Sequence, residues 1–299
     1  MRPGYRATLA GFTTIELLVV TSILTVLSAI TLPILGQARD RARVARCLSN
    51  ARQLGQAAQL YAGDFDERFP SGIGAVGGTR VWAGQGWAGQ CIPYARNRAV
   101  FACPSDAPTE PGAIGSPVSY GYNINLTASP GDRDQQSSPA PPGAAMSALN
   151  APARTVLLFE VAGVYANISD SREGADAGGT PGRHFSASAN GLDHRLYAQR
   201  DWSTRVENQY ATGYLGGRLP PDPSRTQFRS RDGRHAGGSS YVMSDGHSHW
   251  LAGSAVSSGL NALASNCAQD NLPPRVGCGG EFRAAGTDAP APAVTFSIR

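Results

Sequence analysis

Three side chains close together in the C-terminal part of the chain are of types that bind transition metals. Asp245, His247 and His249 fall within five positions, and residues two apart in a strand point to the same face. Carboxylate oxygens and imidazole nitrogens are zinc ligands. Three further histidines could complete a ligand set: His184, His194 and His235. Because two histidines at this spacing are also common on a solvated strand face, we favour that interpretation over a zinc site.

A calcium site is a weaker alternative. Asp170 and Asp176 lie in a loop-like segment, but the sequence there has neither the spacing nor the closing glutamate of an EF-hand loop. We therefore predict no cofactor, with zinc or calcium in this part of the chain as the alternatives.

No set of residues typical of an enzyme active site is present in the sequence. It contains no Gly-x-Ser-x-Gly, His-Glu-x-x-His, Cys-x-x-Cys or P-loop motif, and it contains no lysine. Glu160, near the end of a predicted strand, fits a hydrogen-bonded structural acid better than a general base. We predict that the protein is not an enzyme, with an extracytoplasmic enzyme using His235, His247 and His249 as the alternative.

Five cysteines indicate an oxidising compartment, and one of them must stay unpaired within a monomer. Cys267 and Cys278 lie in a tail with glycine and proline, and we predict that they close a small loop. Cys103 has two candidate partners, the nearby Cys91 and the more distant Cys47. The sequence alone does not fix this connectivity.

A different kind of chemistry is indicated by Glu16, the only charged residue between Gly11 and Leu35. Fourteen of residues 12–35 are Phe, Ile, Leu or Val, and together they contribute on the order of −6 kcal/mol to membrane insertion. Glu16 costs at most about 3 kcal/mol, and less near a helix end. We therefore predict a membrane-spanning helix over residues 12–35, in which a carboxylate needs an explanation.

The flanks of this segment differ from those of a secretory signal peptide. Arg2 and Arg6 precede it, but no small-x-small cleavage site follows it, and the small residue Gly11 comes before it instead. The stretch Gly11-Phe12-Thr13-Thr14-Ile15-Glu16-Leu17-Leu18 resembles the class III leader of type IV prepilins and type II secretion pseudopilins. The resemblance implies that a membrane-embedded peptidase cuts after Gly11 and methylates the new N-terminal Phe12. Glu16 then falls at mature position five, and Pro33 matches a proline usual late in the pilin helix.

The spacing of Phe12 and Glu16 has a physical reason on this interpretation. Residues four apart share a helix face, so the new ammonium group of Phe12 can pair with the carboxylate of Glu16, within one chain or between neighbours. An ammonium partner offsets the cost of a carboxylate buried among apolar helices. The alternative is a plain signal anchor whose Glu16 lies among the lipid head groups.

The helical pattern continues beyond the membrane segment. Apolar residues recur every three or four positions: Val44, Cys47, Leu48, Ala51, Leu54, Ala58 and Tyr61. Arginines mostly occupy the other side: Arg39, Arg41, Arg43, Arg46 and Arg52. The pattern breaks between Asp64 and Pro70. We divide the chain into a leader (1–11), a transmembrane and assembly helix (12–35), an amphipathic continuation (36–63) and a β-rich head (64–299).

Two more motifs resemble a subgroup of prepilin-type proteins that carry an H-x9-D-G, or processing-associated, domain. The helix-to-head junction fits the subgroup pattern at Cys47, Asn50, Gln53, Leu54, Tyr61, Phe69 and Pro70. Nine residues separate His235 from Asp245-Gly246. The subgroup also has a helix cysteine and a Cys-Pro-Ser sequence, which mildly favours a Cys47–Cys103 disulfide.

The head reads as short strands between loops rich in glycine and proline. Candidate strands are 79–82, 155–161, 240–244, 247–251 and 294–298. Asp245-Gly246 between two of them predicts a β-hairpin, with His235 and Asp245 bonding loops across it. Residues 127–147 and 169–191 read as loop insertions, and residues 254–265 as a short helix. The predicted fold is α+β and pilin-like, with a long N-terminal helix packed on an antiparallel sheet.

These observations predict a pilin-like structural subunit that assembles through its helix into a type IV pilus or a type II secretion pseudopilus. The expected partners are prepilin peptidase, other pilin copies, the inner-membrane assembly platform and lipid. The alternative is a minor or tip pilin, or a surface binding module, whose head recognises carbohydrate, protein or DNA. Residues 192–235 hold eight arginines against five acids, a charge excess too small to favour nucleic acid. The four arginines that follow the membrane segment oppose a head outside the cytoplasm, but the leader resemblance implies that location.

Overall fold

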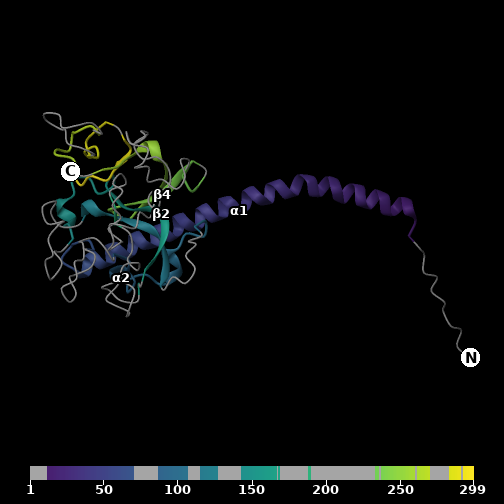
Figure 1. The fold of residues 1–299 in the computed structure, drawn as a ribbon, viewed down its shortest axis with the longest axis horizontal. Coiled ribbons are helices and arrows are strands. Elements are labelled where there is room, and N and C mark those ends of the chain that lie inside the picture. The colour runs from purple at the N-terminus through teal and green to yellow at the C-terminus, as the bar shows by residue number, and fades with distance from the viewer. Residues whose placement is uncertain are drawn as a thin grey trace, which may run out of the picture. The chain divides into compact units, whose positions relative to one another are not determined.

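The structure is a computed structural model that describes residues 12–70, 87–106, 115–126, 143–166, 168, 188–189, 233–235, 237–259, 261–269, 283–290 and 292–299. The chain forms two units, Met1–Arg43 and Val44–Arg299. One long helix begins in the first unit and ends in the second (Figure 1).

The described elements follow in chain order. The helices are α1 (Thr14–Asp64) and α2 (Trp87–Cys91), with short 3₁₀ turns η1 (Arg98–Phe101), η2 (Ile124–Leu126), η3 (Met146–Ala148) and η6 (Gly253–Ala255). The strands are β1 (Ser116–Asn123), β2 (Val156–Ala166), β3 (Ser188–Ala189), β4 (Gly238–Met243), β5 (Ser248–Ala252), β6 (Val256–Ser257) and β7 (Val294–Thr295).

The predicted amphipathic part of α1 is confirmed. Its buried residues lie at helical spacing: Cys47, Ala51, Leu54, Gly55, Ala57, Ala58, Tyr61 and Ala62. The predicted arginines of the opposite side are exposed: Arg39, Arg41, Arg43, Arg46 and Arg52. This part of α1 buries its apolar stripe against the head, while its charged side remains in water.

The helix ends where the sequence predicts, and the local backbone explains how. Asp66 and Glu67 adopt left-handed conformations with φ of 51° and 56°. The Glu67 N–H donates to the carbonyl of Ala62 over 2.9 Å, which satisfies one of the last helix carbonyls. The chain then turns back, and Phe69 is buried in the core.

Five strands form the main sheet in the order β3-β1-β2-β4-β5. The pairs β1/β2, β2/β4 and β4/β5 are antiparallel, as predicted. Two further pairings are parallel, β1/β3 at the edge of this sheet and β6/β7 in a separate two-stranded sheet. Both parallel pairs join strands far apart in sequence, which no local turn signal marks.

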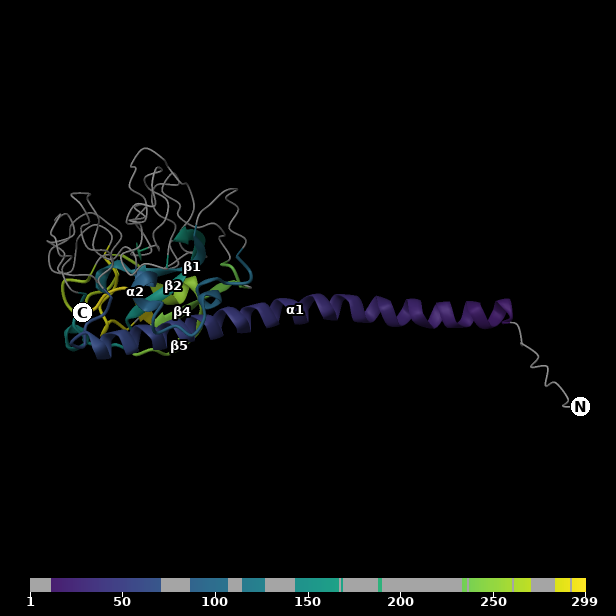
Figure 2. The same ribbon diagram turned by 90° about the horizontal axis from the view of Figure 1, so that it is seen from below.

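The second half of α1 covers one face of this sheet, where it runs beside β4 (Figure 2). Val242 of β4 faces the helix, since a Cβ atom built on Gly55 would lie 2.5 Å from its side chain. The neighbouring Tyr241 points to the other face because side chains alternate along a strand. On that other face Phe159 of β2 packs edge-to-face on Phe296, with ring centroids 4.9 Å apart.

Most predicted strands are found, and one long strand was missed. Segments 155–161, 240–244, 247–251 and 294–298 correspond to β2, β4, β5 and β7, whereas 79–82 lies outside the described residues. The missed strand β1 contains Pro117 and Gly121, which both argue against a strand in sequence. Gly121 is needed because a Cβ there would lie 2.8 Å from the Val161 side chain.

The loop predictions are partly outside the described residues and partly wrong. Residues 143–147, assigned to the first insertion, pack on the segment that follows α1, where Phe69 N–H donates to Ala144 O over 3.0 Å. Residues 188–189, assigned to the second insertion, form β3.

The short helix predicted over 254–265 is also wrong. A 3₁₀ turn there ends at Ala255, β6 follows at once, and Gly259 has φ of 137°. The β-branched Val256 pairs with Val294 of β7 instead of continuing a helix.

Candidate functional site

The N-terminal part of α1 presents apolar side chains on every side. Its large hydrophobic residues from Phe12 to Leu35 are exposed, from 47% for Val20 to 80% for Phe12. Among the described helices, α1 alone is long and apolar enough to cross a membrane. Such a surface is unfavourable in water, which is consistent with a membrane-spanning segment.

Polar side chains within this segment hydrogen-bond inside the helix. Four hydroxyl groups donate to carbonyls three or four residues earlier at 2.8–3.0 Å: Thr21 to Leu18, Ser22 to Val19, Thr25 to Thr21 and Thr31 to Leu27. A hydroxyl bonded to its own helix needs no water. These residues are therefore compatible with a hydrocarbon environment.

Glu16 has a local role that was not assigned from the sequence: it closes the start of the helix. Its carboxylate oxygen Oε2 accepts from the Thr13 N–H at 2.9 Å and from the Thr13 hydroxyl at 2.8 Å. The Glu16 N–H donates back to Thr13 Oγ1 at 3.3 Å. This reciprocal arrangement is a capping box. The signal for it, Thr-x-x-Glu, stands in the sequence at residues 13–16 and was not recognised there.

The other predicted assembly and processing residues are Gly11, Phe12 and Pro33. Pro33 lies inside α1, which runs through it without interruption. Gly11, the residue before the predicted cleavage site, lies outside the described residues.

In the H-x9-D-G motif, strand β4 lies between the histidine, His235, and the Asp-Gly pair, Asp245-Gly246. His235 precedes β4 and Asp245 follows it, so the six residues of β4 separate them by roughly 20 Å at 3.3 Å per residue. The predicted hairpin is confirmed, since Met243 N–H donates to His247 O at 2.8 Å and β4 pairs with β5. His235 and Asp245 lie at opposite ends of β4 and bond different partners: the Trp250 indole N–H of β5 donates to the His235 carbonyl, and the His247 N–H donates to the Asp245 carboxylate.

The Asp-Gly end of the motif packs on α1. Gly246 has φ of 91°, a conformation that favours glycine. A Cβ on Gly55 of the helix would lie 3.1 Å from the Gly246 carbonyl oxygen. Gln59, one turn later, donates through Nε2 to the Ser244 carbonyl. Two glycines thus allow the turn and the helix to approach closely.

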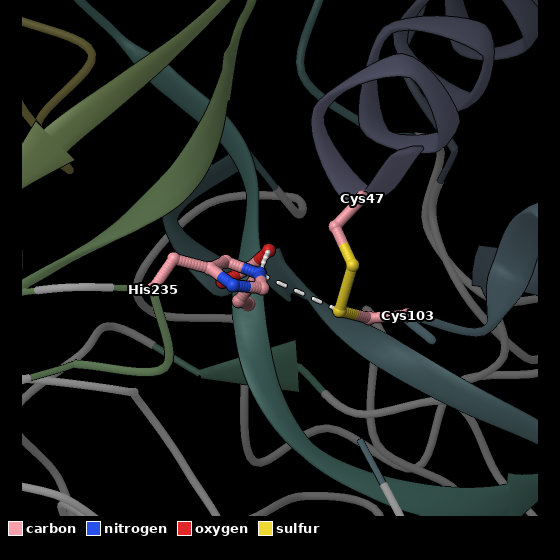
Figure 3. A group of neighbouring side chains, drawn as sticks. Cys47, Cys103 and His235 are labelled. Carbon is pink, nitrogen blue, oxygen red and sulfur yellow. Dashed lines mark hydrogen bonds and ion pairs between the residues drawn. A yellow bond between two sulfur atoms is a disulfide. The ribbon is translucent and has the colours of Figure 1, made fainter. Parts of the chain in front are cut away.

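The His end of the motif packs on the disulfide that holds α1. Cys47 of α1 is bonded to Cys103, which follows η1. His235 points toward this bridge (Figure 3), and its Nε2 atom lies 3.5 Å from Cys103 Sγ. The same Nε2 lies 3.0 Å from Oε1 of Glu160 on β2. All four side chains are buried, so the cluster is closed to solvent.

Further charged and polar side chains of the head lie next to this cluster. Arg234, next to His235, forms a buried ion pair with Asp106 at 3.2 Å. Arg234 also donates to the Val161 carbonyl at 2.6 Å. Burial, and then the nearby Glu160 carboxylate, raise the pKa of Tyr120 well above its usual value. Its neutral hydroxyl donates to the Cys47 carbonyl at 2.8 Å.

Sequence reasoning missed the partners in this cluster. Glu160 was interpreted as a structural acid, which agrees with its hydrogen bond, but its contact with His235 crosses 75 residues. Asp106 and Arg234 each lie beside a recognised motif, Cys-Pro-Ser and His235, and this adjacency was the available signal.

The predicted metal ligands near residue 245 form local contacts only. Asp245 hydrogen-bonds to the His247 ring, and the His247 and His249 rings pack edge-to-face with centroids 4.7 Å apart. They do not belong to the one group of described side chains whose ligand atoms converge, which is Cys47, Cys103, Glu160 and His235. Four further candidate ligands lie outside the described residues: Asp170, Asp176, His184 and His194.

The structure tests the predicted pairing of Cys103, but the predicted partner of Cys267 lies outside the described residues. The Cys47–Cys103 disulfide implied by the resemblance is present, and the alternative between Cys91 and Cys103 is wrong. Cys91 is buried in the head core. Cys267 is disulfide-bonded, while its predicted partner Cys278 lies outside the described residues.

No protein-family model, curated protein sequence or solved structure matches the chain.

Proposed function

We propose that the protein is a pilin-like structural subunit. A prepilin peptidase cuts it after Gly11 and methylates Phe12, and the freed helix assembles with copies of itself or with other pilins into a type IV pilus or a secretion pseudopilus. The observation that carries the proposal is the exposed apolar segment 12–35 of α1, preceded by Gly11 and interrupted only by the charge of Glu16.

The helix start supports this proposal. Because Thr13 caps α1 and the helix begins at Thr14, a chain cut before Phe12 has helical structure from its third residue. Its new ammonium group stands two residues before the first helical residue and four before Glu16, at the end of the helix that Glu16 caps. In a bundle of such helices an unpaired carboxylate is costly. Pairing with the amine of a neighbouring copy satisfies both charges and sets the axial position of one subunit against the next.

The proposal also implies a location and partners for the subunit. The subunit resides in the inner membrane with its head outside the cytoplasm until the assembly platform extracts it. Arg39, Arg41 and Arg43 are exposed on α1, and their long side chains reach the lipid head groups. The Cys47–Cys103 disulfide agrees with an oxidising location for the head.

Processing is tested directly by mass spectrometry of the purified protein. In cells with an active prepilin peptidase, the N-terminal peptide should begin at methylated Phe12. A Gly11→Leu variant should keep residues 1–11. A wild-type protein that retains residues 1–11 in such cells overturns the proposal.

Assembly is tested by two substitutions that separate the charge of Glu16 from its capping role. Glu16→Ala removes the charge and the cap, whereas Glu16→Gln keeps an oxygen that accepts from Thr13. Both should abolish filaments or secretion while processing and head folding persist. Intact assembly in Glu16→Gln would show that the charge is not what aligns the subunits.

A further inference from the structure

We propose that the Cys47–Cys103 bridge is one of two states of a buried cluster, and that its reduced state is a zinc site. The ligands are the two cysteine thiolates, the His235 imidazole and the Glu160 carboxylate. This inference concerns the head alone and does not depend on assembly into a filament.

The geometry of the cluster carries the inference. The ligand atoms of the four side chains all lie within 4.8 Å of one another. In a tetrahedral zinc site with bonds of about 2.0–2.3 Å, ligand atoms are separated by roughly 3.3–3.8 Å. The widest pair must therefore contract by about 1 Å, and the two sulfurs must separate to about 3.8 Å. Side-chain rotations can supply that contraction once the two sulfurs are no longer bonded.

The chemistry of the four groups is that of a closed zinc site. Two thiolates, one imidazole and one carboxylate are all zinc ligands, and four protein ligands leave no open position for a substrate. One oxygen of the buried Glu160 carboxylate, Oε2, has no hydrogen-bond partner among the described residues. A buried carboxylate with an unused oxygen is costly, and coordination to a cation would satisfy it.

The surroundings hold the ligands in place independently of the disulfide. The Trp250 indole N–H donates to the His235 carbonyl at 2.9 Å, and Tyr120 holds the Cys47 carbonyl. Asn50 donates to the Ala102 carbonyl, next to Cys103, at 2.9 Å. The ligands come from α1, the segment after η1, β2 and the segment before β4. A metal here would join the two segments that the disulfide joins, and would link them also to Glu160 of β2 and to His235.

The conversion balances with a dithiol reductant. The dithiol transfers two electrons and two protons to the bridge, giving two thiols and a cyclic disulfide. Zn²⁺ then displaces the two thiol protons, and His235 binds through Nε2 with its remaining proton on Nδ1. Two thiolates and one carboxylate against Zn²⁺ leave one negative charge, close to the buried Arg234–Asp106 pair. Exchange with a second disulfide reverses the step: the two thiolates give up two electrons and re-form the bridge, the second disulfide becomes a dithiol, and Zn²⁺ is released.

The test uses Co²⁺ as a spectroscopic probe of the full chain in detergent. The protein is reduced, freed of reductant and metal without oxygen, and titrated. One equivalent should produce thiolate-to-cobalt charge-transfer absorption and the visible bands of tetrahedral cobalt, which Zn²⁺ then bleaches. The oxidised chain should show neither. Reduced protein that keeps its near-ultraviolet circular dichroism but gives no such bands overturns the proposal.

Variants identify the ligands. Cys47→Ser and Cys103→Ser should remove the charge-transfer band. Glu160→Gln and His235→Gln should weaken Co²⁺ binding by more than the roughly 10- to 100-fold that changes around a metal site typically cost. Cobalt bands that survive Cys47→Ser would place the metal elsewhere and overturn the assignment.

Two controls address the other metal-binding side chains. The double variant Cys267→Ser, Cys278→Ser removes two other cysteines, and His247→Gln alters the exposed histidine pair. Both should bind Co²⁺ as the wild type does. If reduction alone unfolds the head, Zn²⁺ should restore its near-ultraviolet circular dichroism, and failure to do so also counts against the site.

Discussion

The two halves of α1 have the same backbone conformation but meet different surroundings. Before residue 44 no side chain of the helix is buried, and the large apolar residues point in all directions. After it, one stripe is buried, and Cys47, Ala51 and Leu54 have no exposed surface. For the first half, the favourable free energy comes from transfer of apolar area out of water, and this transfer depends little on the shape of the side chains. For the second half, the favourable free energy comes from packing against the head, and packing depends on the shape of the side chain at every position.

This difference separates what each half can tolerate. In the first half any apolar residue of good helix propensity should serve, apart from the positions near Phe12 and Glu16 that carry charge. In the second half a change of one methyl group should be measurable. Matched substitutions in the two halves test the comparison, because the head's stability should respond to one half and ignore the other.

The largest effect is expected from the covalent link between the second half and the head. The Cys47–Cys103 bridge closes 56 residues of chain, and its loss should lower the free energy of unfolding by about 4 kcal/mol on the chain-entropy estimate. The measurement is urea unfolding of the Cys47→Ala, Cys103→Ala double variant, followed by near-ultraviolet circular dichroism with metal chelated. A loss below about 1 kcal/mol would mean that packing alone holds the helix.

A matched pair of leucines should give the next largest effect. Leu54 is fully buried, and Leu54→Ala should cost the head about 3 kcal/mol, within the usual range of 2–5. Leu24 is 56% exposed, and Leu24→Ala should leave the head's urea midpoint unchanged. The same measurement on both variants decides the comparison. Equal losses would show that the two halves are one cooperative unit.

The sequence predicted this division because both halves have strong periodic or compositional signals. Fourteen large apolar residues in 24 positions identify the first half, and the three- and four-residue spacing from Cys47 to Tyr61 identifies the second. The hairpin of β4 and β5 followed from Asp245-Gly246, a local signal. In contrast β1, with a proline and a required glycine, carried no such signal, and its assignment depends on neighbours such as Val161.

The next prediction compares two glycines of the second half. A Cβ on Gly55 would meet Val242 at 2.5 Å, whereas nothing lies within 4 Å of one on Gly63. Gly55→Ala should therefore cost about 1–3 kcal/mol through overpacking. Gly63→Ala should be neutral or stabilising by up to about 1 kcal/mol through helix propensity. Thermal unfolding of both variants tests this, and a stabilising Gly55→Ala would contradict the close approach of α1 and the β4–β5 turn.

The candidate sites were predictable to the extent that their residues are neighbours in sequence. Gly11, Phe12 and Glu16 were found because six residues contain the whole pattern. His235 was found by its motif, but its contacts with Glu160 and Cys103 span 75 and 132 residues. Such contacts follow from strand order and from the register of β2 beside β4, which periodicity does not specify. For that reason the alternative of a zinc site was centred on Asp245, His247 and His249, which are close in sequence, and not on the buried cluster.

The smallest effect at neutral pH is expected from Tyr61, which brings a titratable group into the packed half of the helix. Burial, with smaller contributions from Cys91 and Tyr94, raises the pKa of Tyr61 to about 12, against about 10 in an unfolded chain. Between pH 10 and pH 12 the unfolded state releases a proton that the folded state keeps, so rising pH favours unfolding.

Tyr61→Phe lacks this proton, and its stability should fall less steeply with pH than that of the wild type over that range. Urea unfolding at pH 8, 10 and 11 measures the two slopes. Identical slopes would mean that Tyr61 ionises as freely in the folded head as in water, and that this end of the stripe is not buried as the rest of it is.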